Sequence, residues 1–291
     1  MNCKKTELAK GLYLVATPIG NARDITLRAL DILLCADVLA AEDTRTLRRL
    51  MNIHGIPILD RPVISYHDHS TIRVRNKLLD YLRSGKSVAY TSEAGTPLVA
   101  DPGYKLLKFA IEDGQFVTAV PGPAALLPAL TLAGLPTDSF YFDGFLPSGK
   151  SARRARLEKL SGTRATLIFY ESSKRIAAML QDACDVLGAD RQAAYCRELT
   201  KKFEEVQRGS LQDLRDIVEN KDVKGECVVL VGEAVQQKFN DDDVLSAIQD
   251  ALKLMSMRDA SQIVAETFGL PRREIYQKAL NFTKKIDSKD F

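Results

Sequence analysis

A loop of small and acidic residues in the first half of the chain has the residue types of a binding site. It reads Ser-Glu-Ala-Gly-Thr-Pro-Leu-Val-Ala-Asp-Pro-Gly over residues 92–103. Residues 88–91 before it are typical of a buried strand, and residues 104–111 after it are typical of a helix. In open α/β sheets, ligands bind at the carboxyl ends of strands, where small residues let the backbone approach closely. The loop therefore predicts a small-molecule site, with Glu93 and Asp101 as its carboxylates.

Two further expected strands end in glycine and proline. Residues 17–21 read Thr-Pro-Ile-Gly-Asn, and residues 121–124 read Pro-Gly-Pro-Ala. Each alone indicates only a turn. Three such ends at one edge of a sheet would shape a crevice, which is a common place for a cofactor. No segment matches G-x-G-x-x-G, so the ordinary dinucleotide fingerprint is absent.

Two charged segments follow other expected strands. Residues 42–45 read Glu-Asp-Thr-Arg, and residues 197–201 read Arg-Glu-Leu-Thr-Lys. Either segment can be interpreted as a helix cap with solvated charges. Their place at strand ends also makes them candidates for the site.

Residues 144–151 read Gly-Phe-Leu-Pro-Ser-Gly-Lys-Ser and fit the P-loop pattern G-x-x-x-x-G-K-[ST]. They follow an expected strand and precede an expected helix. However, Phe145 and Leu146 stand where backbone amides should surround phosphates, and Pro147 has no N–H. No apolar strand ends in a suitable magnesium-binding aspartate. A P-loop nucleotide hydrolase is an alternative interpretation.

The next segment is strongly basic: Lys150, Arg153, Arg154, Arg156 and Lys159 lie within ten residues. Such clusters usually form solvated helix faces. Beside a cofactor crevice, they could instead bind the phosphates of a nucleic acid in a salt-sensitive way.

His67-Asp68-His69 could begin a metal site, but the sequence has only one other histidine and no C-x-x-C pair to complete it. A structural or substrate-contacting loop is the preferred interpretation, and no metal is expected.

The elements that position these loops alternate between short apolar runs and periodic segments. This alternation over residues 11–120 predicts an α/β fold with a mainly parallel sheet covered by helices. It continues after Pro121, which suggests a second α/β domain. Three helical segments are then expected at residues 244–254, 260–268 and 272–280, and Gly269 is expected to end the second. The last two resemble a helix-turn-helix, although simple helical hairpins are commoner. The expected domains are an N-terminal α/β domain (residues 1–121), a second α/β domain (122–236) and a small helical domain (237–291).

Composition indicates a soluble globular protein. The 291 residues are 45% apolar and 27% charged, and 41 basic against 38 acidic residues give a net charge of +3. This balance neither requires nor excludes a nucleic acid partner. The five cysteines are scattered and odd in number, which indicates free thiols in a reducing compartment. The apolar stretch 12–19 is too short for a signal peptide, so a cytoplasmic location is expected.

Several motifs in order carry a family resemblance. They are Leu-Tyr-Leu-Val-Ala-Thr-Pro-Ile-Gly-Asn (12–21), Ala-Glu-Asp-Thr-Arg (41–45), the 92–103 loop, Pro-Gly-Pro (121–123), Gly-Phe-Leu-Pro (144–147), Phe-Tyr-Glu-Ser (169–172) and Arg-Glu-Leu-Thr-Lys (197–201). Together they resemble the bacterial family of small-subunit ribosomal RNA methyltransferases I, within the tetrapyrrole-methylase superfamily. The resemblance covers essentially the whole chain.

This resemblance implies methyl transfer from S-adenosyl-L-methionine to the ribose 2′-hydroxyl of a cytidine in 16S rRNA. It also implies a homodimer and a cofactor in the cleft between the two α/β domains. A tetrapyrrole methylase of the same fold is the nearest alternative. The family loop usually reads S-D-A-G-T-P, whereas this chain has Glu93, whose carboxylate reaches one methylene further.

Roles for individual residues follow from the resemblance and from the chemistry. The expected cofactor-binding residues are Pro18, Glu93, Ala94, Thr96, Gly122 and Tyr170. Removal of the hydroxyl proton must accompany or follow methyl transfer, and the candidate acceptors are Glu42, Asp43, Asp101 and Glu198. Alternatively, neighbouring cations could make the hydroxyl acidic. The expected RNA contacts are Arg45, Lys150, Arg153, Arg154, Arg197 and Lys201.

Overall fold

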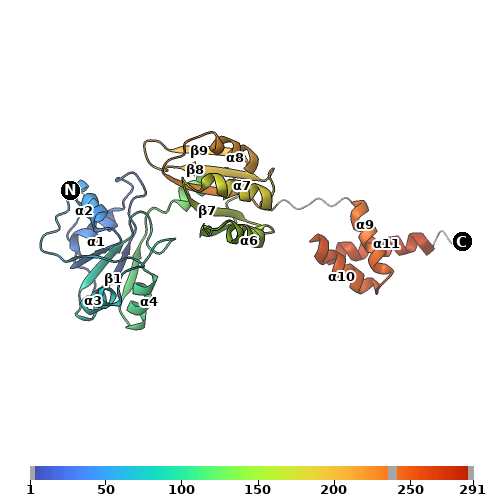
Figure 1. Cartoon of the computed structure of the whole chain (residues 1–291). Coiled ribbons are helices and arrows are strands. Elements are labelled where there is room, and N and C mark those ends of the chain that lie inside the picture. The colour runs from blue at the N-terminus through green and yellow to red at the C-terminus, as the bar shows by residue number, and fades with distance from the viewer. Residues whose placement is uncertain (1–3, 235–240, 288–291) are drawn as a thin grey trace. The chain divides into compact units, whose positions relative to one another are not determined.

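The computed structural model of the protein describes residues 4–234 and 241–287 (Figure 1). The chain divides into two units, Met1–Ala234 and Val235–Phe291. Both α/β sheets belong to the first unit. The expected domain boundary between residues 236 and 237 lies outside the described ranges, as does Cys3. The expected boundary near Pro121 stays a prediction.

The first sheet is wholly parallel, as the alternating pattern predicts, and its strand order is β3-β2-β4-β1-β5. Its strands are β1 (Gly11–Val15), β2 (Val38–Ala41), β3 (Val63–Ser65), β4 (Ser87–Thr91) and β5 (Val117–Val120). Its helices are α1 (Leu27–Cys35), α2 (Thr44–Ile53), α3 (Ile72–Arg83) and α4 (Tyr104–Glu112).

The helices cover both faces of this sheet. Leu33 of α1 and Met51 of α2 pack in one buried cluster, whereas Leu78 of α3 and Leu106 of α4 pack in another. Consequently the chain leaves the neighbouring strands β1 and β4 toward opposite faces, which creates a topological switch point. The three glycine- and proline-containing loops follow β4, β1 and β5, which are adjacent strands. The sequence therefore placed three loops correctly at one sheet edge.

The second sheet has the order β6-β7-β10-β8-β9. Its strands are β6 (Phe140–Phe145), β7 (Thr166–Ser172), β8 (Gln192–Arg197), β9 (Glu205–Ser210) and β10 (Glu226–Val231). The accompanying helices are α5 (Leu126–Leu132), α6 (Lys150–Leu160), α7 (Ile176–Leu187) and α8 (Leu211–Glu219). Strands β6 and β7 pair in parallel, and the other three pairs are antiparallel.

The sequence did not predict β9, for a physical reason. This strand reads Glu-Val-Gln-Arg-Gly-Ser and lies at the sheet edge, where it is not fully buried and needs no continuous apolar run. It follows β8 through a short loop without a helix, so the chain can reverse only into an antiparallel pair. The second sheet is therefore largely antiparallel, although it also has helices on its faces.

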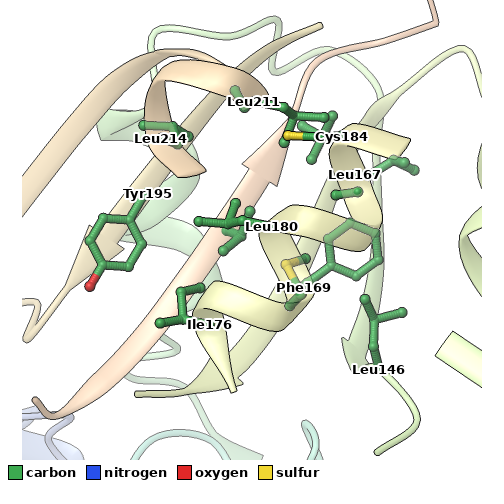
Figure 2. Packing of buried hydrophobic residues seen from close by; sticks show 14 of the residues in the cluster. Leu146, Leu167, Phe169, Ile176, Leu180, Cys184, Tyr195, Leu211 and Leu214 are labelled. Atoms are coloured by element: carbon green, nitrogen blue, oxygen red, sulfur yellow. The ribbon is translucent and has the colours of Figure 1, made fainter. Parts of the chain in front are cut away.

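The second sheet buries its main core under α6, α7 and α8. Leu180 of α7, Leu214 of α8, Phe169 of β7 and Tyr195 of β8 belong to one buried cluster, and Figure 2 shows Leu180 between Phe169 and Tyr195. The short helix α5 covers the opposite face, where Leu130 packs with residues of β7, β8 and β10.

Helix α6 contains all five residues of the basic cluster, and its three arginines are engaged in ion pairs. Arg153 is buried: its Nε donates to Asp182 Oδ2 over 2.7 Å, and its Nη2 lies 2.6 Å from the same oxygen. Arg154 contacts both Asp182 and Asp185, at 3.3 and 2.6 Å. Arg156 pairs with the carboxylate of Asp143. Arg153 therefore fastens α6 to α7, and the expectation that it contacts RNA must be corrected because its guanidinium is not accessible.

The second unit is a three-helix bundle of α9 (Asp241–Leu252), α10 (Met257–Phe268) and α11 (Arg272–Asp287). Its core includes Val244, Ile248, Val264 and Ile275. Ser256 caps α10 at its start. Gly269 ends this helix with φ of 61°, as the sequence predicts. No helix in the described ranges is both long and apolar enough to span a lipid bilayer.

Replacing Arg153 with alanine should destabilise the first unit by about 3 kcal/mol, because it leaves the buried Asp182 carboxylate with only the weaker contact from Arg154. Denaturant unfolding would measure the change. Lys159→Ala on the exposed face of the same helix is the control and should change the free energy of unfolding by less than about 0.5 kcal/mol. Equal stability of the two variants would show that the buried pair does not fasten α6.

Candidate functional site

A cavity of about 750 Å³ opens in the first unit at the carboxyl edge of the first sheet. This volume suits a ligand of nucleoside size. Residues from both sheets line it. Of the residues singled out from the sequence, the structure places nine around this cavity: Pro18, Glu42, Glu93, Ala94, Thr96, Asp101, Tyr170, Glu198 and Lys201.

The loops after β1, β4 and β5 are joined by backbone and hydroxyl hydrogen bonds. Thr17 and Gly95 exchange two backbone hydrogen bonds, of 2.8 and 3.0 Å. Thr96 Oγ1 donates to the carbonyl oxygen of Pro123 over 2.8 Å. Gly122 does not line the cavity, but a Cβ there would lie 2.8 Å from Cβ of Ala16. Gly122 therefore lets the third loop pack closely behind the first.

Tyr170, at the end of β7, forms an aromatic wall of the cavity. Its ring packs edge-on against Phe142 and Phe145, with centroids 4.8 and 5.8 Å apart. Its hydroxyl accepts a hydrogen bond from the backbone N–H of Leu126 over 3.0 Å. Burial raises the pKa of Tyr170 to about 12, so the phenol is neutral at physiological pH.

The backbone is strained in two loops at the cavity. Among the described residues, five non-glycine residues have positive φ. Leu98 (73°) and Ala100 (60°) lie in the 92–103 loop, and Glu198 (51°) and Thr200 (65°) lie in the β8–β9 loop. Strained conformations of this kind persist where the surroundings enforce them and are often found at functional sites.

Glu198, in the β8–β9 loop, is held by two hydrogen bonds. Its Oε1 accepts from Lys201 Nζ over 2.8 Å and from the backbone N–H of Glu226 over 3.2 Å. The φ of Gly225 is 89°, and a Cβ there would meet the Glu198 side chain, so this position favours glycine. Burial raises the pKa of Glu198, but these hydrogen bonds outweigh it and lower the pKa overall. Glu198 is therefore an ionised, immobilised carboxylate.

The same loop touches the loop after β1. The backbone N–H of Asn21 donates to Thr200 Oγ1 over 3.0 Å. A Cβ on Gly20 would lie 2.5 Å from Cγ of Lys201, so the approach requires glycine. Two loops that are distant in sequence thus close one side of the cavity.

Asp101 has the most altered carboxyl group of the site. Burial raises its pKa to about 7; Glu42, Glu93 and Glu226 raise it as well, whereas a hydrogen bond with Ser92 lowers it. Such a pKa allows a carboxyl group to exchange a proton near neutral pH.

Asp43 and Arg45 do not line the cavity. Asp43 caps α2 by accepting from the backbone N–H of Arg45 over 2.7 Å, and its carboxylate pairs with the Arg45 guanidinium. Hydrogen bonds from Arg45 lower the pKa of Asp43 to about 2. The helix-cap interpretation therefore holds for Asp43. Glu42, in contrast, faces the cavity and accepts from the backbone N–H of Glu93 over 3.2 Å.

Arg197, Lys150 and Arg154 also lie outside the cavity lining. Arg197 donates to Glu205 Oε2 from Nε and Nη2, over 3.1 and 2.9 Å, and borders a separate hollow of about 180 Å³. Lys150 is exposed at the start of α6.

The P-loop alternative is wrong for this chain. Leu146 is buried in the core, and the carbonyl oxygens of Leu146 and Pro147 accept from Arg175 Nη2 over 2.6 and 3.2 Å. The segment therefore directs carbonyls toward a cation, whereas a phosphate loop must direct N–H groups toward an anion.

Sequence reasoning missed several lining residues. Arg49 and Thr46 come from the middle of α2, Lys174 from the turn after β7, and Gly225 and Glu226 from the start of β10. None belongs to a recognisable motif of its own. Glu171 lies within a quoted motif, yet its role was not anticipated: it is buried, and its Oε2 accepts no hydrogen bond from the described residues, although Arg175 lies 3.2 Å away.

The charges of the lining suit a cationic ligand. Six carboxylates border the cavity against three cations. A sulfonium compound with an ammonium group would be attracted by this excess of negative charge. The lining therefore fits S-adenosyl-L-methionine. No three His, Cys, Asp or Glu side chains gather to hold a metal ion within the described ranges. The rings of His67 and His69 lie 6.2 Å apart.

Comparison with known proteins identifies two family matches. The profile of the tetrapyrrole (corrin/porphyrin) methylases matches residues 11–215, and that of the RsmI C-terminal HTH domain matches residues 240–282. Ribosomal RNA small subunit methyltransferase I of Mesorhizobium japonicum is 45% identical over 274 residues, covering 94% of this chain and 92% of that protein. The protein of the same name from Halalkalibacterium halodurans is 42% identical over 272 residues, covering 91% and 93%.

Solved structures show the same fold at low sequence identity. A cobalt precorrin-4 methyltransferase, CbiF, has a TM-score of 0.59 at 18% identity and covers 76% of this chain and 94% of its own. Uroporphyrin-III C-methyl transferase from Thermus thermophilus, complexed with S-adenosylhomocysteine, has a TM-score of 0.54 at 20% identity and covers 77% and 98%.

Asp101→Asn should stabilise the protein at alkaline pH. Folding raises the pKa of Asp101 from 3.8 to about 7. The stability that this carboxyl group contributes is therefore fully present below pH 3.8 and is lost as the pH rises through about 7. Above pH 8 the amide avoids burying a charge, and we expect a Tm about 2–4 °C above wild type because partial exposure screens the effect. The difference should vanish near pH 4. Asp138→Asn, at an exposed site, should show no such pH dependence.

Proposed function

Because this chain belongs to the ribosomal RNA small subunit methyltransferase I family of tetrapyrrole-fold methylases, we propose that it methylates the ribose 2′-hydroxyl of cytidine 1402 in 16S rRNA. Ribosomal RNA methylation is the activity class of the family. The methyl donor in this proposal is S-adenosyl-L-methionine.

One observation carries the proposal: a nucleoside-sized cavity with an excess of carboxylates lies where three loops of adjacent strands meet. A related fold has been solved with S-adenosylhomocysteine. A tetrapyrrole substrate is less well supported, because the relatives with 37–45% identity over most of the chain are named ribosomal RNA methyltransferases. The second unit matches a domain named for the same proteins.

The bound donor would supply an electrophilic methyl group attached to a sulfonium sulfur. Pro18, Ala94 and Thr96 would hold it through the loops after β1 and β4, and Tyr170 would pack against it. Glu93 lies at the same edge. Gly122 contributes by letting the loop after β5 pack closely against Ala16. Because the three loops are tied together, they can hold the two reactants in one alignment, which lowers the entropic cost of reaction.

Asp101 is our choice as the acceptor of the hydroxyl proton. Its pKa of about 7 matches the working pH of a general base. Glu198 is less suitable because Lys201 and the backbone of Glu226 already occupy its Oε1. Asp43 points away into its helix cap. Glu42 raises the pKa of Asp101 and is therefore an electrostatic partner.

The partners follow from the same proposal. The substrate is 16S rRNA in naked or subunit-bound form, and the protein works in the cytoplasm, where ribosomes are assembled. The homodimer implied by the resemblance stays a prediction.

The decisive experiment supplies radiolabelled S-adenosyl-L-methionine and small ribosomal subunits that lack their modifications. Label on the ribose of one cytidine at the decoding centre is expected. Label on a base, or no label on the RNA, would contradict the proposal.

Thr96→Ala should weaken binding of S-adenosyl-L-methionine about five- to tenfold, because the loop after β4 loses its hydrogen bond to Pro123. Thr96→Ser keeps the hydroxyl group that donates to Pro123, and its affinity for S-adenosyl-L-methionine should stay within about threefold of wild type. Isothermal titration calorimetry measures both. An unchanged affinity of the alanine variant would place the cofactor away from this loop.

Asp101→Asn should reduce kcat at least about 100-fold while leaving the affinity for the cofactor within about threefold of wild type. The wild-type kcat should rise with pH through about 7 and then level off, because only the ionised carboxylate accepts a proton. If the asparagine variant keeps both the rate and this pH profile, another group is the base.

A further inference from the structure

RNA brings phosphates to a cavity whose lining repels them. Its carboxylates are Glu42, Glu93, Asp101, Glu171, Glu198 and Glu226, and its cations are Arg49, Lys174 and Lys201. Lys201 is not available, since its Nζ lies 2.8 Å from Glu198 Oε1 and 2.9 Å from Glu226 Oε2. Two lining cations therefore remain to offset the repulsion of a backbone phosphate.

Arg49, the first of these two cations, is positioned at the cavity by helix α2. Leu47 and Met51 pack one face of this helix against the first sheet, and Leu50 is buried as well. Thr46 and Arg49, one turn apart, lie on a face that borders the cavity. Arg49 is exposed and has no ion-pair partner within the described part of the chain. Its guanidinium is thus free to bind an anion in a bidentate manner.

Lys174, the second lining cation, lies in the turn between β7 and α7. Its neighbour Arg175 is engaged with Glu171 and with the carbonyls of Leu146 and Pro147. Lys174 itself is exposed and unpaired among the residues that the structure describes. The two free cations therefore reach one cavity from elements of different sheets.

We propose that Arg49 and Lys174 bind RNA backbone phosphates next to the nucleotide that enters the cavity. This inference rests on the proposed function and assigns the RNA contacts nearest to the reaction. It moves them from α6, where Arg153, Arg154 and Arg156 are paired with aspartates, to α2 and the turn after β7. Charge complementarity selects the occupant, because a polyanion needs exposed, unpaired cations at the rim of an acidic cavity.

The test compares two double variants with the same change of net charge. Arg49→Gln/Lys174→Gln removes the two rim cations. Arg73→Gln/Lys77→Gln removes two exposed cations on α3 that do not border the cavity and have no ion-pair partner among the described residues. Each is assayed with unmodified small subunits and radiolabelled S-adenosyl-L-methionine over a range of salt concentrations, and cofactor affinity is measured separately by calorimetry.

We expect the rim variant to raise KM for the subunits at least tenfold at low salt, with kcat and cofactor affinity within twofold of wild type. The slope of log KM against log salt should fall by about 1 to 2, one phosphate contact for each lost cation. The α3 variant should stay within twofold of wild type in every quantity.

Equal KM and salt slope in the rim variant and wild type would overturn the inference, as would an equal effect of the two double variants. Weakened cofactor binding by the rim variant would also overturn it, because the cations would then belong to the donor site. Failure of the wild-type protein to methylate ribosomal RNA under any condition would instead refute the proposed function.

Discussion

The hydrogen-bonded contact between Thr17 and Gly95 is the constraint on which the site depends. It joins the loops after β1 and β4, two neighbouring strands whose following helices lie on opposite faces of the sheet. Without it, these loops would diverge at the switch point. The bond from Thr96 to Pro123 attaches the third loop, and the bond from Asn21 to Thr200 attaches the second sheet. These hydrogen bonds thus join four loops into one wall of the cavity.

Buried strands and the loops that directly follow them could be predicted from the sequence. Apolar runs in a parallel sheet are continuous, so every strand of the first sheet was predictable, as were the loops that follow β1, β4 and β5. Edge strand β9 was not, because Glu205 to Arg208 is polar and half-exposed. The helix ending at Gly269 was predictable because its left-handed φ favours glycine.

The site was only partly predictable, since sequence shows residue types but not their partners. Arg153 and Arg154 of α6 could not be distinguished from free cations, because their partners Asp182 and Asp185 are about thirty residues away and meet them only through the packing of α6 on α7. Arg49 and Lys174 carried no motif. In the same way, nothing in the sequence separated Asp101 from Asp43. Burial near three other carboxylates raises the pKa of Asp101, whereas Asp43 is engaged as the cap of α2.

The excess of six carboxylates over three cations has a consequence for turnover. On the proposed function, the donor arrives with a positively charged sulfur and leaves as a neutral thioether. The net negative charge of the lining attracts the sulfonium donor, whereas the neutral thioether product gains no comparable electrostatic attraction. The acidic wall therefore discriminates between fresh and spent donor, so that product release is favoured by the same electrostatics that loads the enzyme.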